Sequence, residues 1–272
     1  MKSLPIEVPR ETLNAIHHGP YAFHDVHAYQ LTFRSDPAVV SKLVPEPLVA
    51  NRRGLVSLVV AQYLGGVSTP EETIPGYDEL VIGVPAKYRT PEGEELAGLY
   101  MVQLYLADRT PGSGCDPTIL GLVVPGYPKR SCNWQELQRG NDRHIRVARR
   151  GEDVVGLRIV DAPLAPVSLK PASGASFLLK YIPSATEERC ADVLKLNLVR
   201  GSTQLTSMAV VKVGFDGDAV RLDTGTRLPV HEVLSSMRCT MTMTPERTVE
   251  LVDYLARPES SGRATHEASS LP

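Results

Sequence analysis

A single lysine stands out in the stretch PGYPKRSCNW, residues 125–134. Lys129 follows an apolar run, TILGLVV (118–124), that is typical of a buried strand, and it precedes the only tryptophan, Trp134. An amine among apolar side chains can attack a ketone carbonyl, but only when it is neutral, because an ammonium has no lone pair. At the ordinary lysine pKa near ~10.4, fewer than about one amine in a thousand is neutral at neutral pH.

Two influences could favour the neutral amine, namely removal from water and a nearby like charge. The adjacent Arg130 could supply the charge, since a guanidinium is permanently protonated. The apolar surroundings would come from Leu120, Leu122, Val123 and Val124. A plainer interpretation stays open, in which Lys129 keeps its amine in water and Arg130 points outward, because neighbours on a strand face opposite sides.

Other side chains could serve the same chemistry. Glu79, in YDELVIG, could transfer protons, although beside Asp78 it could also mark a solvated turn. Tyr127 lies two residues before Lys129 and would share its face on an extended segment. Trp134 could shape a pocket or fill core. Cys132 has no His–Asp partner pattern, which favours plain packing.

The elements that must position these residues are mostly strands. Short alternating or β-branched segments bounded by turns predict strands at 28–33, 54–64, 79–88, 98–106, 118–124, 144–150, 154–160, 176–183, 193–201 and 207–215. A hairpin turn is expected at GED, 151–153. Helices are expected at 35–44 with Ser35 as N-cap, at 228–237, and at 244–256 with Thr244 as N-cap and Pro245 in the first turn.

Composition narrows the functional classes. The 272 residues are 42% hydrophobic with a net charge of -2, which permits a sizeable core and gives no electrostatic reason to expect nucleic acid or an anionic membrane. The N-terminus has no apolar leader and no run of membrane-spanning length, so a cytoplasmic protein is predicted. The four cysteines are far apart, and no glycine-rich segment has phosphate-loop spacing. No metal and no nucleotide or other cofactor is predicted.

Five stretches, read in order, resemble the acetoacetate decarboxylase family. They are GPYAFHD (19–25) with the following FRSD and LVPEPL, GYDELVIGVPAKY (76–88), GYPKR (126–130), LLKYIP (178–183) and LPVHEVLSS (228–236). The resemblance implies an α+β, mostly β fold: a cone-shaped β-barrel or packed sheets with a few flanking helices and an interior pocket, in a homo-oligomer. It spans one domain at 19–256, between an N-terminal extension (1–18) and a polar tail (257–272) that is expected to be disordered.

The resemblance also assigns roles. Lys129 falls on the family's imine-forming lysine, Glu79 on a glutamate of the pocket, and Arg130 where a second lysine is common. Three charged positions of the family are apolar here: Val26 replaces an arginine, Leu58 or Val59 a glutamate, and Val123 an acidic residue. Val26, Val123, Tyr127, His24 and Trp134 are therefore predicted to bind substrate. His24 and His27 could compensate for the missing arginine, or be ordinary structural histidines.

The expected function is that of a carbon–carbon lyase. A ketone or β-keto acid, larger and less polar than acetoacetate, would form an imine on Lys129 and then an enamine. The same intermediate could instead support aldol addition with dehydration, or cyclisation, in a secondary-metabolic or degradative pathway. A binding module that holds a small molecule without turnover is the non-enzymatic alternative.

Overall fold

The computed structural model describes residues 20–70, 73–108, 126–166, 172–184 and 191–256. Strands dominate this part of the chain, which holds a 14-stranded sheet, a two-stranded sheet and a single helix. The expectation of a mostly β fold is confirmed. The described helix has seven residues, and no helix of these segments is long and apolar enough to cross a membrane.

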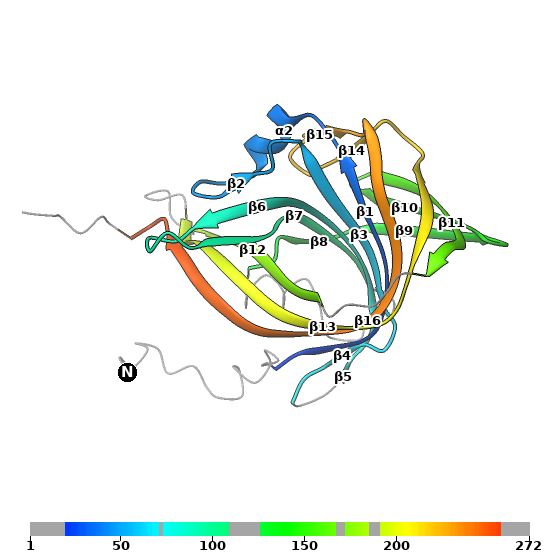
Figure 1. Ribbon diagram of the computed structural model, residues 1–272, viewed down its shortest axis with the longest axis horizontal. Coiled ribbons are helices and arrows are strands. Elements are labelled where there is room, and N and C mark those ends of the chain that lie inside the picture. The colour runs from blue at the N-terminus through cyan, green and yellow to red at the C-terminus, as the bar shows by residue number, and fades with distance from the viewer. Residues whose placement is uncertain (1–19, 71–72, 109–125, 167–171, 185–190, 257–272) are drawn as a thin grey trace, which may run out of the picture.

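Seven strands of the large sheet form a closed ring of hydrogen-bonded pairs. In ring order they are β1 (Ala22–Arg34), β3 (Leu55–Tyr63), β6 (Tyr77–Arg89), β7 (Glu95–Asp108), β12 (Ala172–Pro183), β13 (Ala191–Phe215) and β16 (Glu232–Asp253). β16 closes the ring because it pairs with both β13 and β1. Figure 1 shows β13 and β16 as long curved strands.

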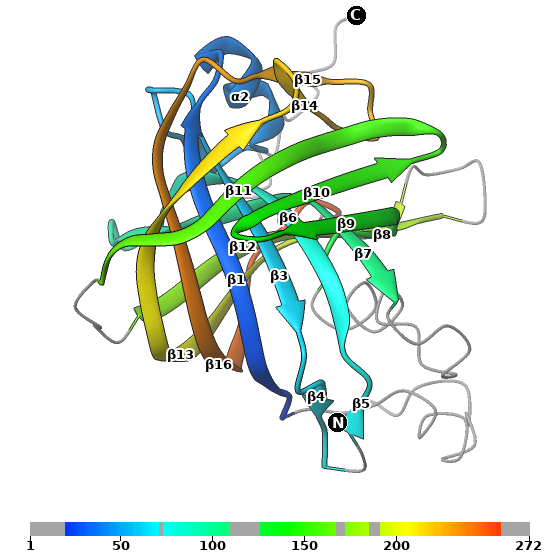
Figure 2. The same cartoon turned by 90° about the vertical axis from the view of Figure 1, so that its right-hand side faces the viewer.

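The remaining strands extend or flank this ring. β11 (Glu152–Pro166), β10 (Asp142–Arg149) and β9 (Asn133–Arg139) continue the sheet outward from β13, and Figure 2 shows them lying across the ring strands. β8 (Lys129–Ser131) pairs with β7 in parallel. The short strands are β2 (Val49–Ala50), β4 (Val67–Ser68), β5 (Thr73–Ile74), β14 (Ala219–Arg221) and β15 (Arg227–Pro229).

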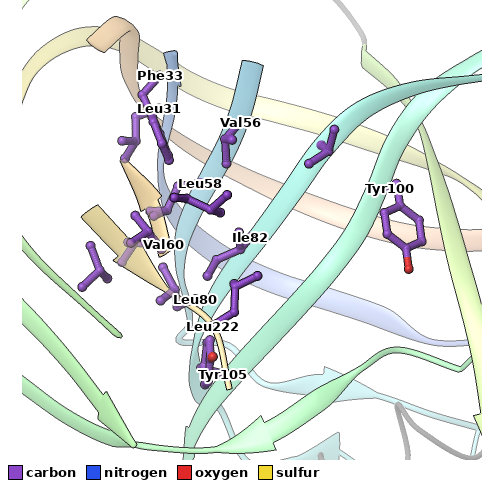
Figure 3. Close-up of a cluster of buried hydrophobic side chains, with 14 of the residues drawn as sticks. Leu31, Phe33, Val56, Leu58, Val60, Leu80, Ile82, Tyr100, Tyr105 and Leu222 are labelled. Carbon is purple, nitrogen blue, oxygen red and sulfur yellow. The ribbon is translucent and has the colours of Figure 1, made fainter. Parts of the chain in front are cut away.

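The strands β1, β3 and β6 bury side chains on both faces. On one face, Leu31, Leu58 and Leu80 belong to a large hydrophobic cluster, which we call the main core. Figure 3 shows these side chains together with others of the main core. Because side chains alternate along a strand, Val26, Ala61 and Tyr77 face the other way and form a second cluster. We call that second face the lysine face, since Lys129 lies on it.

The predicted helix near residue 37 is confirmed with shifted bounds. α2 spans Pro37–Leu43, and its N-cap is Asp36 rather than Ser35. The Asp36 side chain accepts a hydrogen bond from the backbone N–H of Ala38, at 2.8 Å, and the proline occupies the first turn, where its missing N–H costs nothing.

The two helices predicted in the C-terminal part are wrong. Residues 232–253 form β16 and residues 227–229 form β15. Pairing of β16 with strands on both of its sides outweighs the local helical spacing, which is a weak preference. Pro245 is accommodated because it lies at a register shift opposite Gly201, where a proline does not interrupt a regular ladder.

The predicted strands are confirmed wherever the structure describes them. The segments 193–201 and 207–215 are one strand, β13, instead of two. The expected hairpin joins β10 to β11, but its turn is Arg150–Gly151 instead of 151–153, and Glu152 already begins β11. Arg150 and Gly151 both have positive φ (52° and 84°), which matches the right-handed twist of the flanking strands. The predicted strand 118–124, the extension 1–18 and the tail 257–272 lie outside the described residues.

Candidate active site

Lys129 reaches the lysine face through the pairing of three adjacent strands. Figure 1 shows β6, β7 and β8 in succession. Glu79 of β6 lies opposite Leu106 of β7, and Lys129 of β8 lies beside Leu104. Leu104 and Leu106 are two residues apart and share one face, so the amine and the carboxylate project to the same side of the sheet.

The charged ends of these two side chains meet in a nearly dry environment. Lys129 Nζ lies 3.3 Å from Glu79 Oε1, and the two side chains are 8% and 5% exposed. The amine also donates to the Tyr77 hydroxyl at 3.4 Å. Glu79 Oε2 accepts a 2.7 Å hydrogen bond from the Tyr63 hydroxyl. Both partners of a buried ion pair are thus present, which avoids the cost of an unpaired buried charge.

Tyrosine rings surround the amine. Lys129 Nζ lies 5.1 Å from the ring centre of Tyr77 and 5.7 Å from that of Tyr127, within cation–π range of both. Burial, and next the negative charge of Glu79, raise the pKa of Tyr63 and of Tyr77 well above the ordinary value. The same two causes raise the pKa of Tyr127. These phenols therefore stay neutral over the physiological pH range.

The segment before β8 is shaped by Gly126. Its φ of 91° favours glycine, and an added Cβ would come within 2.5 Å of the Lys180 Cβ. Two residues later the chain turns tightly, since the backbone N–H of Lys129 donates to the Tyr127 carbonyl at 2.8 Å. Close approach to β12 and this turn bring Tyr127 and Lys129 to one side, as strand alternation predicted.

Arg130 does not face Lys129. It pairs with Tyr105, a main-core residue, and its Nε lies 3.9 Å from Asp223 Oδ2. Its guanidinium also donates to the Lys129 carbonyl at 3.0 Å. This corrects the prediction that Arg130 is an electrostatic neighbour of the amine, because successive residues of a strand point to opposite faces. The alternative in which Arg130 points outward agrees with these contacts.

The apolar residues that stand where the family has charged ones do not all lie on the lysine face. Val26 belongs to the second cluster but has no exposed surface, so a bound molecule could touch it only after side chains move. Val59 packs against the same cluster, whereas Leu58 lies in the main core. Of the two residues suggested for the lost glutamate, Val59 is the one on the lysine face. Val123 lies outside the described residues.

Four other predicted or weighed side chains have their described contacts away from the amine. His24 Nε2 is hydrogen-bonded to Ser68 Oγ at 2.9 Å, and His27 Nε2 to Asp25 Oδ1 at the same distance. Trp134 packs against the main core, so its predicted role in binding substrate beside Lys129 is not supported. Burial raises the pKa of the Cys132 thiol to about 12, which keeps it protonated and agrees with plain packing.

Sequence reasoning missed Tyr63 and Tyr77. A signal for Tyr77 was present, since it lies two residues before Glu79 on one strand and must share its face. No local signal identifies Tyr63, because its contact with Glu79 depends on the register between β3 and β6. Clusters of three or more His, Cys, Asp or Glu able to hold a metal do not occur in the part of the chain that the structure describes.

A family model described as acetoacetate decarboxylase matches residues 3–255, nearly the whole chain. The chain belongs to the acetoacetate decarboxylase family. Acetoacetate decarboxylase 1 of Bradyrhizobium diazoefficiens is 26% identical over 251 residues, which cover 88% of this chain and 90% of that protein. Membership in this family supports an enzymatic activity, and the resemblance inferred from the five stretches is confirmed.

Solved structures agree with the fold of the acetoacetate decarboxylase family. An acetoacetate decarboxylase from Legionella pneumophila superposes with a TM-score of 0.71 at 17% identity, over 94% of this chain and 95% of that one. The enduracididine biosynthesis enzyme MppR, complexed with pyruvate, superposes with a TM-score of 0.67 at 16% identity, over 93% and 98% of the two chains. At such identities the likeness concerns the fold alone.

Proposed function

We propose that this protein is a carbon–carbon lyase that forms an imine between Lys129 and a ketone or β-keto acid. The observation that carries the proposal is the buried Lys129 amine, 3.3 Å from the Glu79 carboxylate on a face of apolar and tyrosine side chains. A lysine that served only solubility would keep its amine in water.

Glu79 accepts the first proton that is transferred in the reaction. An ammonium cannot attack a carbonyl, and the carboxylate 3.3 Å away can accept its proton. The neutral amine then adds to the carbonyl carbon, and loss of water leaves an iminium ion. The positive nitrogen attracts the electrons released when the carboxylate on the carbon next to the iminium carbon departs as carbon dioxide. The resulting enamine takes a proton at carbon, and water then hydrolyses the imine to free Lys129.

The substrate is proposed to be larger and less polar than acetoacetate. Two described positions that carry charge in family decarboxylases hold valine here, Val26 and Val59, and both belong to or pack against the second cluster. Arg130 supplies no compensating charge on this face, since it lies on the other side of β8. The small molecule would therefore be held mainly by contact with apolar and aromatic side chains.

The valines at positions 26 and 59 also favour a second candidate function. If the site lacks a partner for a substrate carboxylate, the iminium could drive aldol addition and dehydration of a ketone without loss of carbon dioxide. The likeness to MppR in complex with pyruvate is compatible with this candidate, although it concerns the fold alone. Both candidates need the imine on Lys129, and they differ in their products.

Borohydride trapping tests the proposal. The protein is incubated with β-keto acids and aryl ketones in turn, reduced, digested and mapped by mass spectrometry. We expect a substrate mass on Lys129 that is absent in Lys129→Ala and retained in Lys87→Ala, which removes an exposed lysine paired with Glu95. Release of carbon dioxide identifies a decarboxylase, and its absence with a condensed product identifies an aldolase. No adduct with any ketone would overturn the imine proposal in favour of a binding module.

A further inference from the structure

We infer that Tyr77 is a catalytic acid–base residue of this site, and that Tyr63 is a positioning residue that connects it to Glu79. The inference rests on the imine chemistry proposed above and adds two side chains to it. The two tyrosines act in the loss of water during imine formation, a step that needs a proton donor next to the reacting carbon.

The amine, two tyrosines and Glu79 form a loop of neighbouring side chains. Lys129 Nζ donates to the Tyr77 hydroxyl at 3.4 Å, and the Tyr77 ring packs against the ring of Tyr63. Tyr63 donates to Glu79 Oε2 at 2.7 Å, and Glu79 Oε1 completes the loop 3.3 Å from the amine. The centres of the Tyr63 and Tyr77 rings lie 4.4 Å apart with 30° between the ring planes, so the two rings pack closely against each other.

One oxygen of the loop lacks a hydrogen-bond partner. Glu79 Oε1 is buried and, apart from its ion-pair contact with Lys129 Nζ, makes no hydrogen bond. A buried oxygen in that state is costly, and it faces the atom that must lose a proton before attack. Glu79 Oε1, the oxygen that faces the amine, is therefore the one available to accept the ammonium proton.

A balanced sequence of transfers follows from this geometry. Glu79 Oε1 takes a proton from the Lys129 ammonium, and the amine forms a bond to the carbonyl carbon. The nitrogen passes a proton to the former carbonyl oxygen, which gives a neutral carbinolamine. The carbon–oxygen bond then breaks as the nitrogen lone pair forms the iminium, and Tyr77 protonates the departing hydroxide to give water. Tyr77 recovers a proton from Tyr63. The protonated Glu79 carboxyl then turns to donate its proton to Tyr63, which regenerates the carboxylate.

A neutral phenol suits this role. Hydroxide is a strong base, so a weak acid can protonate it at the moment the bond breaks. Burial, the first cause, and the Glu79 charge, the second, raise the pKa of Tyr77 well above its ordinary value. The proton therefore stays on Tyr77 until the leaving hydroxide appears. The returning path through Tyr63 keeps the site at one net protonation state from turnover to turnover.

The test follows adduct formation with acetylacetone, a diketone that gives a conjugated, absorbing enaminone with an amine. We expect Tyr77→Phe to slow the reaction by about a hundredfold, the usual contribution of one acid–base group. Tyr63→Phe should slow it by about tenfold and should also reduce the solvent deuterium isotope effect, a readout that a packing role would not change. Tyr100→Phe, which removes a buried phenol of the main core, is the matched control and should leave the rate unchanged.

The outcomes separate this inference from the proposed function. No adduct in the unaltered protein, with either acetylacetone or the borohydride panel, overturns the imine itself. An adduct that forms within about threefold of the normal rate in folded Tyr77→Phe overturns only the role of Tyr77. Should Tyr77→Phe fail to fold, the isotope effect of the unaltered protein decides. An effect of about twofold or more supports proton transfer in the slow step, and an effect near unity overturns it.

Discussion

Lys129 and Arg130 are neighbours in the chain, yet their side chains end on opposite faces of the sheet. The Lys129 amine lies 3.3 Å from Glu79 Oε1, among tyrosines and apolar side chains. The Arg130 guanidinium points to the other side, with Nε 3.9 Å from Asp223 Oδ2. Once Glu79 has taken its proton, Lys129 can therefore serve as the proposed nucleophile, while Arg130 takes part in holding the strand.

This division predicts unequal effects of two neighbouring substitutions. Lys129→Ala should abolish adduct formation with ketones, since no other amine lies at this position. Arg130→Gln should change the rate by less than about tenfold, because a half-exposed charge on the far face is screened by solvent. Rates measured with the same ketone check both. A loss in Arg130→Gln as large as that in Lys129→Ala would show that the far-face charge does act on the amine.

Behind Lys129, Asp223 joins several elements. Its carboxylate accepts from Arg149 Nε at 2.7 Å and from the Tyr105 hydroxyl at 3.1 Å, which ties the turn after β14 to β10 and β7. Arg149 also donates to the Ser131 carbonyl at the end of β8. Asp223→Asn should lower the free energy of unfolding by about 2 kcal/mol, because two partly buried partners lose a charged acceptor.

Urea denaturation measures this loss, and Asp218→Asn is its control. Asp218 pairs with Arg227 at 2.9 Å, but its side chain is 87% exposed. Exposed pairs contribute little, so this variant should lose less than about 0.5 kcal/mol. Equal losses in the two variants would mean that the Asp223 contacts are no stronger than a surface ion pair.

Alkaline pH should destabilise the fold. The pKa values of Tyr63, Tyr77 and Tyr127 are raised by burial and then by Glu79, and burial raises the pKa of Cys132 to about 12 and that of Cys239 to about 11. Above the ordinary thiol and phenol values, 9.0 and 10.0, the unfolded chain loses protons that the folded chain keeps. The unfolded state then binds fewer protons, so stability falls as the pH rises through this window.

The free energy of unfolding measured over a series of alkaline pH values checks this sign. Tyr127→Phe should give a shallower fall than the unaltered protein, because one proton difference between the two states has been removed. Tyr181→Phe removes an exposed phenol and should leave the slope unchanged. Stability that is constant or that rises over the same range would contradict the assignment of neutral buried phenols.

A charged side chain at position 26 should lower the free energy of unfolding. Val26 is fully buried against Tyr63 and Met241 across its two neighbouring strands. Val26→Arg would take a guanidinium out of water at a fully buried position, at a cost of at least about 3 kcal/mol. Val26→Met, of similar length but uncharged, should cost less than about 2 kcal/mol. Urea denaturation compares the two, and an unfolding free energy of Val26→Arg equal to that of Val26→Met would show that the site can solvate a cation.

Local sequence patterns were enough to predict most of the strands and to select Lys129 as the candidate nucleophile. Alternating apolar segments separated by glycine and proline predicted six of the seven ring strands, all but β16, and the GYPKR segment matched Lys129 to the imine-forming lysine of the acetoacetate decarboxylase family. The shared side of Tyr127 and Lys129 was also predicted, although a tight turn rather than strand alternation produces it. These features depend on residues that are close in the chain, so local patterns carry them.

Which distant side chains meet follows from the three-dimensional packing of the strands. The helical spacing at 244–256 was overruled by the pairing of β16 with β13, where each residue gains partners that local preference cannot anticipate. Tyr63 reaches Glu79 through the register of β3 with β6, and Asp223 reaches Arg130 across the fold. Register and long-range contact follow from the packing of the whole sheet. The partners of Lys129 and Arg130 are therefore fixed by that packing rather than by the residues beside them in the chain.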